Sequence, residues 1–215
     1  MNEILTDKLR EISLNSGADL FGIADAHDFS EYTGKRNPSF YIDTARSVIV
    51  IGHQVNDPML DMWLNPIDGK RHYYFINEVL GNIALGVISA LLEEGKKAIL
   101  SPYSGVYAKD AAVLAGLGTI GKNNLLLTEQ FGPRVRLRAI VTDAGLLKTP
   151  RKQESFCDNC PRFCWPACPA DAFASGQFNK AACIEYSLEH TEKPSDNSNL
   201  YCRKCEIVCP VGKEV

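Results

Sequence analysis

The first 156 residues of this 215-residue chain contain no cysteine, and all eight cysteines lie in the remainder. A disulfide framework would need cysteines along the whole chain, so this distribution excludes one for most of the protein. In a reducing cytosol, dense groups of cysteines more often bind metal. The chain therefore joins two different compositions.

The sequence also lacks a basic excess, a long hydrophobic run and a leader. Its net charge of −3 argues against a broad nucleic-acid surface. Apolar runs such as Val48–Ile51 are too short to span a bilayer. The mixed-charge amino terminus shows no signal-peptide pattern. We expect a cytoplasmic protein that binds neither nucleic acid nor membrane.

The segment before the cysteines is typical of an α/β domain, over residues 1–150. Apolar residues recur at helical spacing from residue 4 and again over residues 72–94, and a glycine follows each stretch. Runs rich in β-branched residues indicate buried strands. We expect strands at 18–24, 47–52, 96–101, 125–128 and 134–143, and a third helix at 108–115.

Residues 116–122 read Gly-Leu-Gly-Thr-Ile-Gly-Lys, which matches the G-x-G-x-x-G fingerprint of dinucleotide-binding folds. That fold needs a strand before the glycines and a helix after them. Here a helix precedes and a strand follows, so the match does not indicate a NAD site. The glycines instead allow close approach of the backbone, either to a packed neighbour or to a flat ligand.

The cysteine-rich residues 151–215 carry two groups that each end in Cys-Pro. The groups are CDNCPRFCWPACP (157–169) and CRKCEIVCP (202–210), and Cys183 lies alone between them. Bacterial ferredoxins bind [4Fe-4S] clusters with C-x2-C-x2-C-x3-C-P, whose last cysteine serves the other cluster. Zinc is the alternative, because C-x2-C pairs also build zinc ribbons. The trailing Cys-Pro and the even division of eight thiolates favour two clusters.

Crossed pairing, by analogy with those ferredoxins, divides the cysteines into two sets of four. The first set is Cys157, Cys160, Cys164 and Cys209. The second set is Cys168, Cys183, Cys202 and Cys205. Three residues separate Cys160 from Cys164, one more than in ferredoxins. We expect a local bulge of the loop to absorb the extra residue.

Together, the glycine and cysteine patterns resemble those of epoxyqueuosine reductases and reductive dehalogenases. The likeness runs from about residue 70 to 210 and includes AGLGTIGKN (115–123), FGPR (131–134) and Thr142-Asp143. It implies a nitroreductase-like α/β domain over residues 1–150 that binds a corrinoid such as cobalamin. It also implies a bacterial-ferredoxin-like domain over residues 151–215, whose two [4Fe-4S] clusters supply electrons to the cobalt.

The same resemblance implies that the glycine loop lies against the corrin ring. The residues concerned are Gly116, Leu117, Gly118, Gly121, Lys122 and Asn123. Lys122 and Asn123 would hydrogen-bond corrin amides or, alternatively, cap the surface. Tyr103 and Tyr107, in the loop before the glycines, are candidate catalytic proton donors, with simple packing as the alternative.

Two further features have two interpretations each. Arg134, Arg136 and Arg138 alternate along one expected strand, so their guanidinium groups share a face. That face is either solvated or binds a phosphate of the corrinoid nucleotide tail. His53 follows an expected strand and either ligates cobalt or makes local contacts.

The resemblance also bears on substrate, partners and electron route. In epoxyqueuosine reductases a proposed proton-donor aspartate lies fourteen residues before the first glycine, where this chain has Pro102. This difference, the acidic net charge and the short segment after Cys209 disfavour tRNA as the substrate. We expect a small organic substrate, or reductive activation of a corrinoid for a partner protein. The alternatives are an electron carrier without a corrinoid and a divergent epoxyqueuosine reductase.

The electrons would come from a low-potential carrier of the ferredoxin or flavodoxin type. In the resembling families the cluster equivalent to that of the second set lies against the ring. Electrons would therefore pass through the cluster of the second set last.

Overall fold

The computed structural model describes residues 2–64, 73–152 and 155–213, which fold into two compact units that interleave along the chain. The sheet unit comprises Met1–Gln54, Val79–Gly118 and Arg136–Gln153. The cysteine unit comprises Val55–Glu78, Thr119–Val135 and Glu154–Val215. The composition suggested one division near residue 150, whereas in the structure the cysteine-rich segment folds together with two segments from the first 150 residues.

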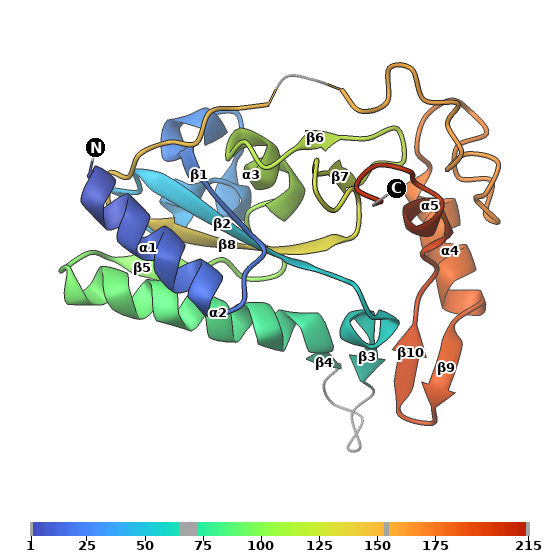
Figure 1. Cartoon of the computed structure of the whole chain (residues 1–215), viewed down its shortest axis with the longest axis horizontal. Coiled ribbons are helices and arrows are strands. Elements are labelled where there is room, and N and C mark those ends of the chain that lie inside the picture. The colour runs from blue at the N-terminus through green and yellow to red at the C-terminus, as the bar shows by residue number, and fades with distance from the viewer. Residues whose placement is uncertain (1, 65–72, 153–154, 214–215) are drawn as a thin grey trace. The chain divides into compact units, whose positions relative to one another are not determined.

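A four-stranded sheet in the order β1-β2-β8-β5 forms the centre of the sheet unit (Figure 1). Its strands are β1 (Leu20–Asp25), β2 (Ser47–Gln54), β8 (Val135–Thr142) and β5 (Ala98–Leu100). The apolar runs predicted each of them. Residues 48–51 of β2 are fully buried, so both faces of this strand are covered. The predicted α/β fold class is confirmed.

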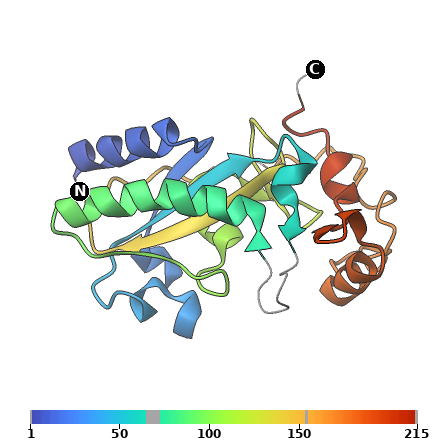
Figure 2. The same ribbon diagram turned by 90° about the horizontal axis from the view of Figure 1, so that it is seen from below.

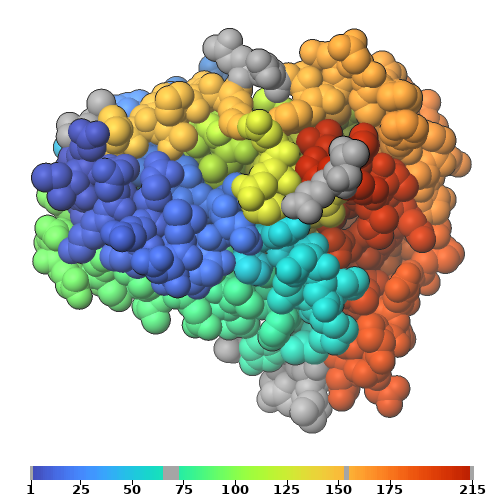
Figure 3. Space-filling model, viewed as in Figure 1, coloured from blue at the N-terminus to red at the C-terminus, as the bar shows by residue number. Residues whose placement is uncertain are grey.

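Helices cover this sheet. They are α1 (Glu3–Asn15), α2 (Phe75–Glu93) and α3 (Ala108–Leu114), with short 3-10 helices η1 (Ala26–Phe29), η2 (Gly34–Arg36) and η3 (Pro38–Phe40). α1 begins at Asn2, whose side-chain oxygen accepts a hydrogen bond from the N–H of Leu5 at 3.0 Å. α1 and α2 pack side by side (Figures 1, 2 and 3), and a Cβ added to Gly86 would lie 3.4 Å from Ile12.

The long helix α2 begins later than the pattern predicted. The tyrosines at 73–74 form strand β4 (Tyr73–Tyr74) instead, and the predicted first residue, His72, lies outside the described residues. By length and composition α2 could cross a membrane, since its mean hydropathy is 1.7. The short apolar runs noted in the sequence did not indicate this possibility. This is weak evidence, because the core helix of a globular protein passes the same test. Leu80 and Leu91 of α2 are fully buried.

The cysteine unit has a second four-stranded sheet, in the order β4-β3-β10-β9, and a two-stranded hairpin, β6-β7. Its remaining elements are η4 (Pro58–Asp61), β3 (Trp63–Leu64), β6 (Thr119–Ile120), β7 (Leu126–Leu127), β9 (Glu192–Ser195), β10 (Ser198–Leu200), α4 (Lys180–Glu189) and α5 (Lys204–Ile207). Most of them are too short to produce a periodic pattern, so only β7 was predicted. The description of the two units as nitroreductase-like and ferredoxin-like stays a prediction.

Candidate functional site

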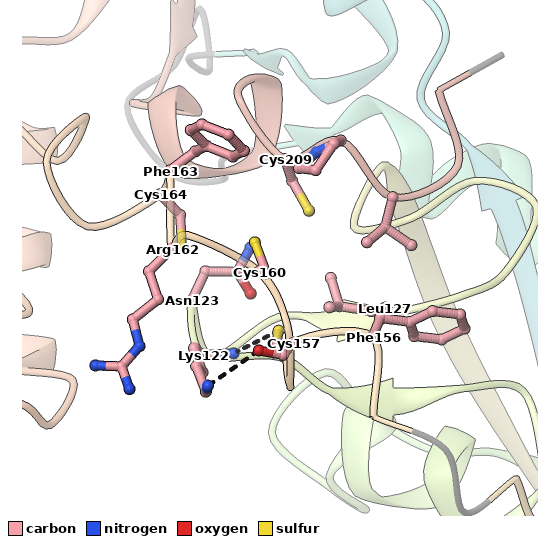
Figure 4. A pocket seen from close by; sticks show the side chains of 12 residues that line it. Lys122, Asn123, Leu127, Phe156, Cys157, Cys160, Arg162, Phe163, Cys164 and Cys209 are labelled. Carbon is pink, nitrogen blue, oxygen red and sulfur yellow. Dashed lines mark hydrogen bonds between the residues drawn. The ribbon is translucent and has the colours of Figure 1, made fainter. Parts of the chain in front are cut away.

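The first set of cysteines lines one pocket of the cysteine unit (Figure 4). These cysteines are Cys157, Cys160, Cys164 and Cys209. Three of them belong to one loop, and the fourth follows α5. Apolar side chains, among them those of Leu127, Phe156 and Val211, line the same pocket. The structure therefore brings together the four cysteines that crossed pairing groups.

A residue in the left-handed region accommodates the extra position between Cys160 and Cys164. Arg162 has a φ of 61°, which residues with a side chain rarely adopt. Its carbonyl accepts a hydrogen bond from the backbone N–H of Trp165 at 2.9 Å. Its guanidinium lies over the Trp165 ring, 4.6 Å from the centroid. The expected bulge is therefore this turn, and Cys164 still reaches the pocket.

The second set of cysteines gathers around α4 and α5. Cys183 lies in the first turn of α4, and Cys205 lies in α5. Burial raises the pKa of the Cys183 thiol, and the thiols of Cys168 and Cys202 raise it further. Burial, followed by Cys183, Cys202 and Cys168, raises the pKa of Cys205 to about 12. The thiols that act on one another are thus those of the predicted second set.

The thiols of the first set also raise the pKa values of one another. Burial raises the pKa of Cys164 to about 11, and Cys209, Cys157 and Cys160 contribute in turn. Burial also raises the pKa of Cys209, although the nearby Arg134 guanidinium opposes this. Each set thus gathers four sulfurs that would repel one another when ionised, and all of them except that of Cys202 are at least partly buried. A metal centre would provide the counter-charge that lets all four ionise, and binding it would release protons.

Two kinds of metal centre bind sets of four thiolates. Among residues 2–64, 73–152 and 155–213, no group of three or more His, Cys, Asp or Glu side chains could hold a metal ion. A structural zinc ion needs four sulfurs about 2.3 Å from one point. A cubane cluster binds its thiolates at four separate iron corners and holds them farther apart. The choice of two clusters over zinc stays a prediction, which rests on the Cys-Pro that ends each cysteine group.

The first half of the glycine loop packs inside the sheet unit. Gly116 follows α3 with a φ of 70°, and an added Cβ would lie 2.1 Å from the carbonyl oxygen of Pro150. Leu117 is 9% exposed and packs on β1, where a Cβ added to Gly22 would lie 2.8 Å from it. Gly118 is also buried. Of the two interpretations of the glycines, close packing accounts for Gly116.

Gly121 occupies the turn of the β6-β7 hairpin in the cysteine unit. Its N–H donates to the carbonyl of Leu125 at 2.8 Å, and an added Cβ would lie 2.6 Å from Leu127. Close packing therefore accounts for this glycine too. Because the two halves of the loop belong to different units, a corrin wall formed by both stays a prediction. The order of α3, glycines and β6 confirms that this is no dinucleotide turn.

Lys122 and Asn123 connect the glycine loop to both cysteine sets. The backbone N–H of Lys122 donates to the Cys157 sulfur at 3.4 Å, and its ammonium donates to the Cys157 carbonyl at 3.0 Å. The Lys122 carbonyl accepts from the Trp165 indole at 3.1 Å. Asn123 is 4% exposed and donates to the carbonyl of Cys205 at 3.4 Å. The sequence did not indicate these contacts, and Asn123 is no surface cap.

Tyr107 lies in a cluster of aromatic and charged residues of the sheet unit. It is half exposed, and the Arg36 guanidinium lies 3.8 Å from its ring centroid. The Tyr32 ring lies 6.3 Å away, and the Tyr32 hydroxyl donates to Asp110 at 3.0 Å. Burial and then this hydrogen bond raise the pKa of Tyr32 to about 12. Tyr103 is 68% exposed. Proton donation by Tyr103 or Tyr107 stays a prediction.

The three arginines after the glycine loop have different surroundings. Arg134 donates to the carbonyls of Cys209 at 3.3 Å and Val211 at 2.7 Å, which anchors the segment after α5. Arg136 and Arg138 are half-buried, so the face they share is not fully solvated. Phosphate binding by them stays a prediction.

His53 makes local contacts at the end of β2. Its Nδ1 lies 2.9 Å from the carbonyl oxygen of Gly17 and 3.1 Å from a carboxylate oxygen of Asp19. These contacts account for the histidine without a metal. Ligation of cobalt by it stays a prediction.

The chain is homologous to reductive dehalogenases and epoxyqueuosine reductases. No protein-family model matches it. It is 36% identical over 119 residues to a tetrachloroethene reductive dehalogenase of Dehalobacter restrictus, covering 47% of this chain and 21% of that protein. It is 31% identical over 157 residues to an epoxyqueuosine reductase of Lactococcus garvieae, covering 68% and 43%. The chain thus spans less than half the length of these relatives.

Solved structures of both families share the fold. Epoxyqueuosine reductase from Bacillus subtilis has a TM-score of 0.72 at 20% identity, covering 98% of this chain and 66% of that one. A reductive dehalogenase, whose structure suggests a mechanism for B12-dependent dehalogenation, has a TM-score of 0.70 at 18% identity, covering 96% and 32%. The resemblance predicted from the sequence patterns is confirmed, and the relatives are redox enzymes.

Proposed function

We propose that this chain is an iron–sulfur redox protein that binds a corrinoid and supplies electrons to it from two [4Fe-4S] clusters. The observation that carries the proposal is the assembly of the eight cysteines into two sets of four, each drawn from distant parts of the sequence. Two such clusters typically transfer electrons one at a time at low reduction potential. The oxidoreductase relatives support this class of activity.

Residues around the two cysteine sets support this proposal. The first set would hold one cluster, with the N–H of Lys122 directed at the Cys157 sulfur, and hydrogen bonds of that kind tune cluster potential. Apolar side chains, among them Leu127 and Phe156, line part of the first pocket (Figure 4). The second set would hold the other cluster on α4 and α5. Each cluster, when bound, accepts and releases one electron.

Support for the corrinoid comes from the relatives rather than from the glycines. The space beside Gly116 and Gly121 is filled by protein atoms, so these positions provide no free surface for a ring. Among the relatives of known structure is the reductive dehalogenase associated with B12-dependent dehalogenation. In this proposal a bound corrinoid would provide the reactive cobalt, and Tyr103 and Tyr107 are exposed phenols of the sheet unit, of which Tyr107 lies beside Arg36.

A second candidate is a two-cluster electron carrier without a corrinoid. The contacts of Gly116, Lys122 and Asn123 favour this candidate, because these residues of the glycine loop already pack against or hydrogen-bond to other parts of the protein. In either case we propose a low-potential ferredoxin or flavodoxin as the donor, and a cytoplasmic location. We propose a small molecule or a corrinoid-dependent protein as the acceptor, since Pro102 replaces the expected aspartate and the net charge is −3. A divergent epoxyqueuosine reductase, acting on tRNA, is the remaining alternative.

Two measurements test the proposal. Anaerobic purification followed by iron and acid-labile sulfide analysis should find about eight of each per chain, the content of two cubanes. Stoichiometric zinc without sulfide would refute the cluster assignment. The holoprotein should then be mixed with hydroxocobalamin, which should co-elute with a changed spectrum. A protein that retains both clusters but binds no cobalamin would be the electron carrier instead.

A further inference from the structure

Buried acidic groups lie beside the second set of cysteines. Arg203, between Cys202 and Cys205 in the sequence, contacts two carboxylates: its Nε lies 3.2 Å from Glu206 and 3.5 Å from Asp61. The side chains of Arg203, Asp61 and Glu206 are only 13%, 9% and 4% exposed. Glu206 directly follows Cys205 in the chain, so its buried carboxylate belongs to the helix that carries this cysteine.

Cationic groups lie beside the first set. The Lys122 ammonium donates to the Cys157 carbonyl at 3.0 Å, and the Arg134 guanidinium donates to the Cys209 carbonyl at 3.3 Å. Both side chains belong to half-buried residues. The buried Arg203 guanidinium offsets one of the two carboxylate charges beside the second set, so this group of three side chains keeps a net negative charge. Two further charges of the opposite signs, Asp158 at the first set and Lys204 at the second, belong to exposed residues. Water and salt therefore screen them more strongly.

We infer that these fixed charges give the two clusters unequal reduction potentials, higher at the first set and lower at the second. The inference rests on the proposed function only in requiring the two clusters, and it needs no corrinoid. Adding an electron to a cluster makes it more negative. A nearby carboxylate therefore disfavours reduction, and a nearby ammonium or guanidinium favours it. The interior screens such effects less than the surface does.

The arrangement assigns roles in cluster reduction to three residues, of which the sequence patterns had connected only Lys122 with a cofactor. Asp61 and Glu206 are positioning residues that lower the potential of the second cluster. Lys122 raises the potential of the first. An electron shared between the two clusters would therefore reside mainly on the first one.

The test is a redox titration of the anaerobically purified full chain with dithionite, followed by electron paramagnetic resonance and without corrinoid. Each cluster takes one electron from dithionite, from the 2+ to the 1+ state. Cys183→Ser identifies the signal of the second cluster, because it alters one ligand of that set. Asp61→Asn should then raise the potential of the second cluster by at least a tenfold change in its reduction equilibrium, which is about 59 mV for one electron.

Two further variants complete the test. Lys122→Gln should lower the potential of the first cluster by a similar factor, while Lys122→Arg retains the charge and should restore it. Asp57→Asn is the matched control, since Asp57 lies in the same segment but is exposed and caps η4 with an oxygen that asparagine also has. It should shift neither potential. A merely structural role of Asp61 or Lys122 would change cluster content without this pattern of shifts.

The outcomes separate this inference from the proposed function. A parent chain whose second cluster has the higher potential would overturn the inference, as would unchanged potentials in Asp61→Asn and Lys122→Gln with full iron content. If Asp61→Asn fails to fold, the comparison of Lys122→Gln with Lys122→Arg still tests whether fixed charges set the cluster potentials. Failure to bind cobalamin would refute the proposed function and leave these potentials unaffected. Absence of iron and sulfide would refute both.

Discussion

Replacing Gly132 by alanine should remove the first cluster and leave the second. Gly132 has a φ of 56°, and an added Cβ would lie 1.9 Å from the carbonyl oxygen of Val211. Val211 belongs to the segment that follows Cys209, and the backbones meet so closely that a Cβ on Gly212 would lie 2.2 Å from the Gly132 nitrogen. Alanine must therefore push away the segment that carries one ligand of the first set.

The loss of stability expected for Gly132→Ala has two parts. An L-residue in the left-handed region costs about 1–2 kcal/mol. Forcing a methyl group into a packed site costs about 1–3 kcal/mol more, and here the obstacle is backbone rather than a flexible side chain. Gly176 separates the two parts: its φ is 81°, but nothing lies within 4 Å of an added Cβ. Gly176→Ala should show only the first cost.

The assay compares these two variants by urea unfolding and by iron content after anaerobic purification. We expect Gly132→Ala to be less stable than Gly176→Ala by about 1–3 kcal/mol. It should retain about four irons instead of about eight, since only one cubane lacks a ligand. If the two variants are equally stable and both keep full iron, the packing of this turn against the segment after Cys209 does not support the first set.

Three further predictions concern single groups. Cys183→Ser should slow the reduction of bound Co(II) cobalamin in stopped-flow measurements without weakening cobalamin binding. If a variant that lacks one cluster still reduces cobalamin at the parent rate, the last electron transfer to cobalt must start from the first cluster instead. Tyr32 should titrate near pH 12 in ultraviolet absorbance, so the stability it contributes is complete below its usual pKa of about 10 and is lost as the pH rises towards 12. Asp110→Asn should lower the pKa of Tyr32, and an unchanged titration would contradict the 3.0 Å hydrogen bond. Burial opposes ionisation of Asp28, but Lys148 at 2.6 Å and other ion pairs lower its pKa, so the stability it contributes is present above the usual carboxyl pKa and is lost at lower pH. Asp28→Asn should therefore flatten the acid-unfolding curve, measured by circular dichroism.

Regular elements were predictable because their signal is local. β2 contains an unbroken run of β-branched residues, Val48–Ile51, and α1 has apolar residues one turn apart, so each can be recognised from its own residues. The grouping of cysteines was also predictable, because Cys-Pro spacing carries the crossed pairing of ferredoxins. Tyr73 and Tyr74 show the limit: they continue a helical pattern, yet they pair with β3 as a strand.

The sequence by itself determined the strands of the main sheet and the long helices that cover it, and it predicted which four cysteines would share a cluster. Only the tertiary structure decided what the glycine loop and the charged residues contact. Gly116 meets Pro150, Lys122 meets Cys157, and Asp61 meets Arg203. No periodic pattern connects such pairs, because each depends on how distant loops pack. Burial then decides how strongly a charge acts on its neighbours, and burial is a property of the folded chain.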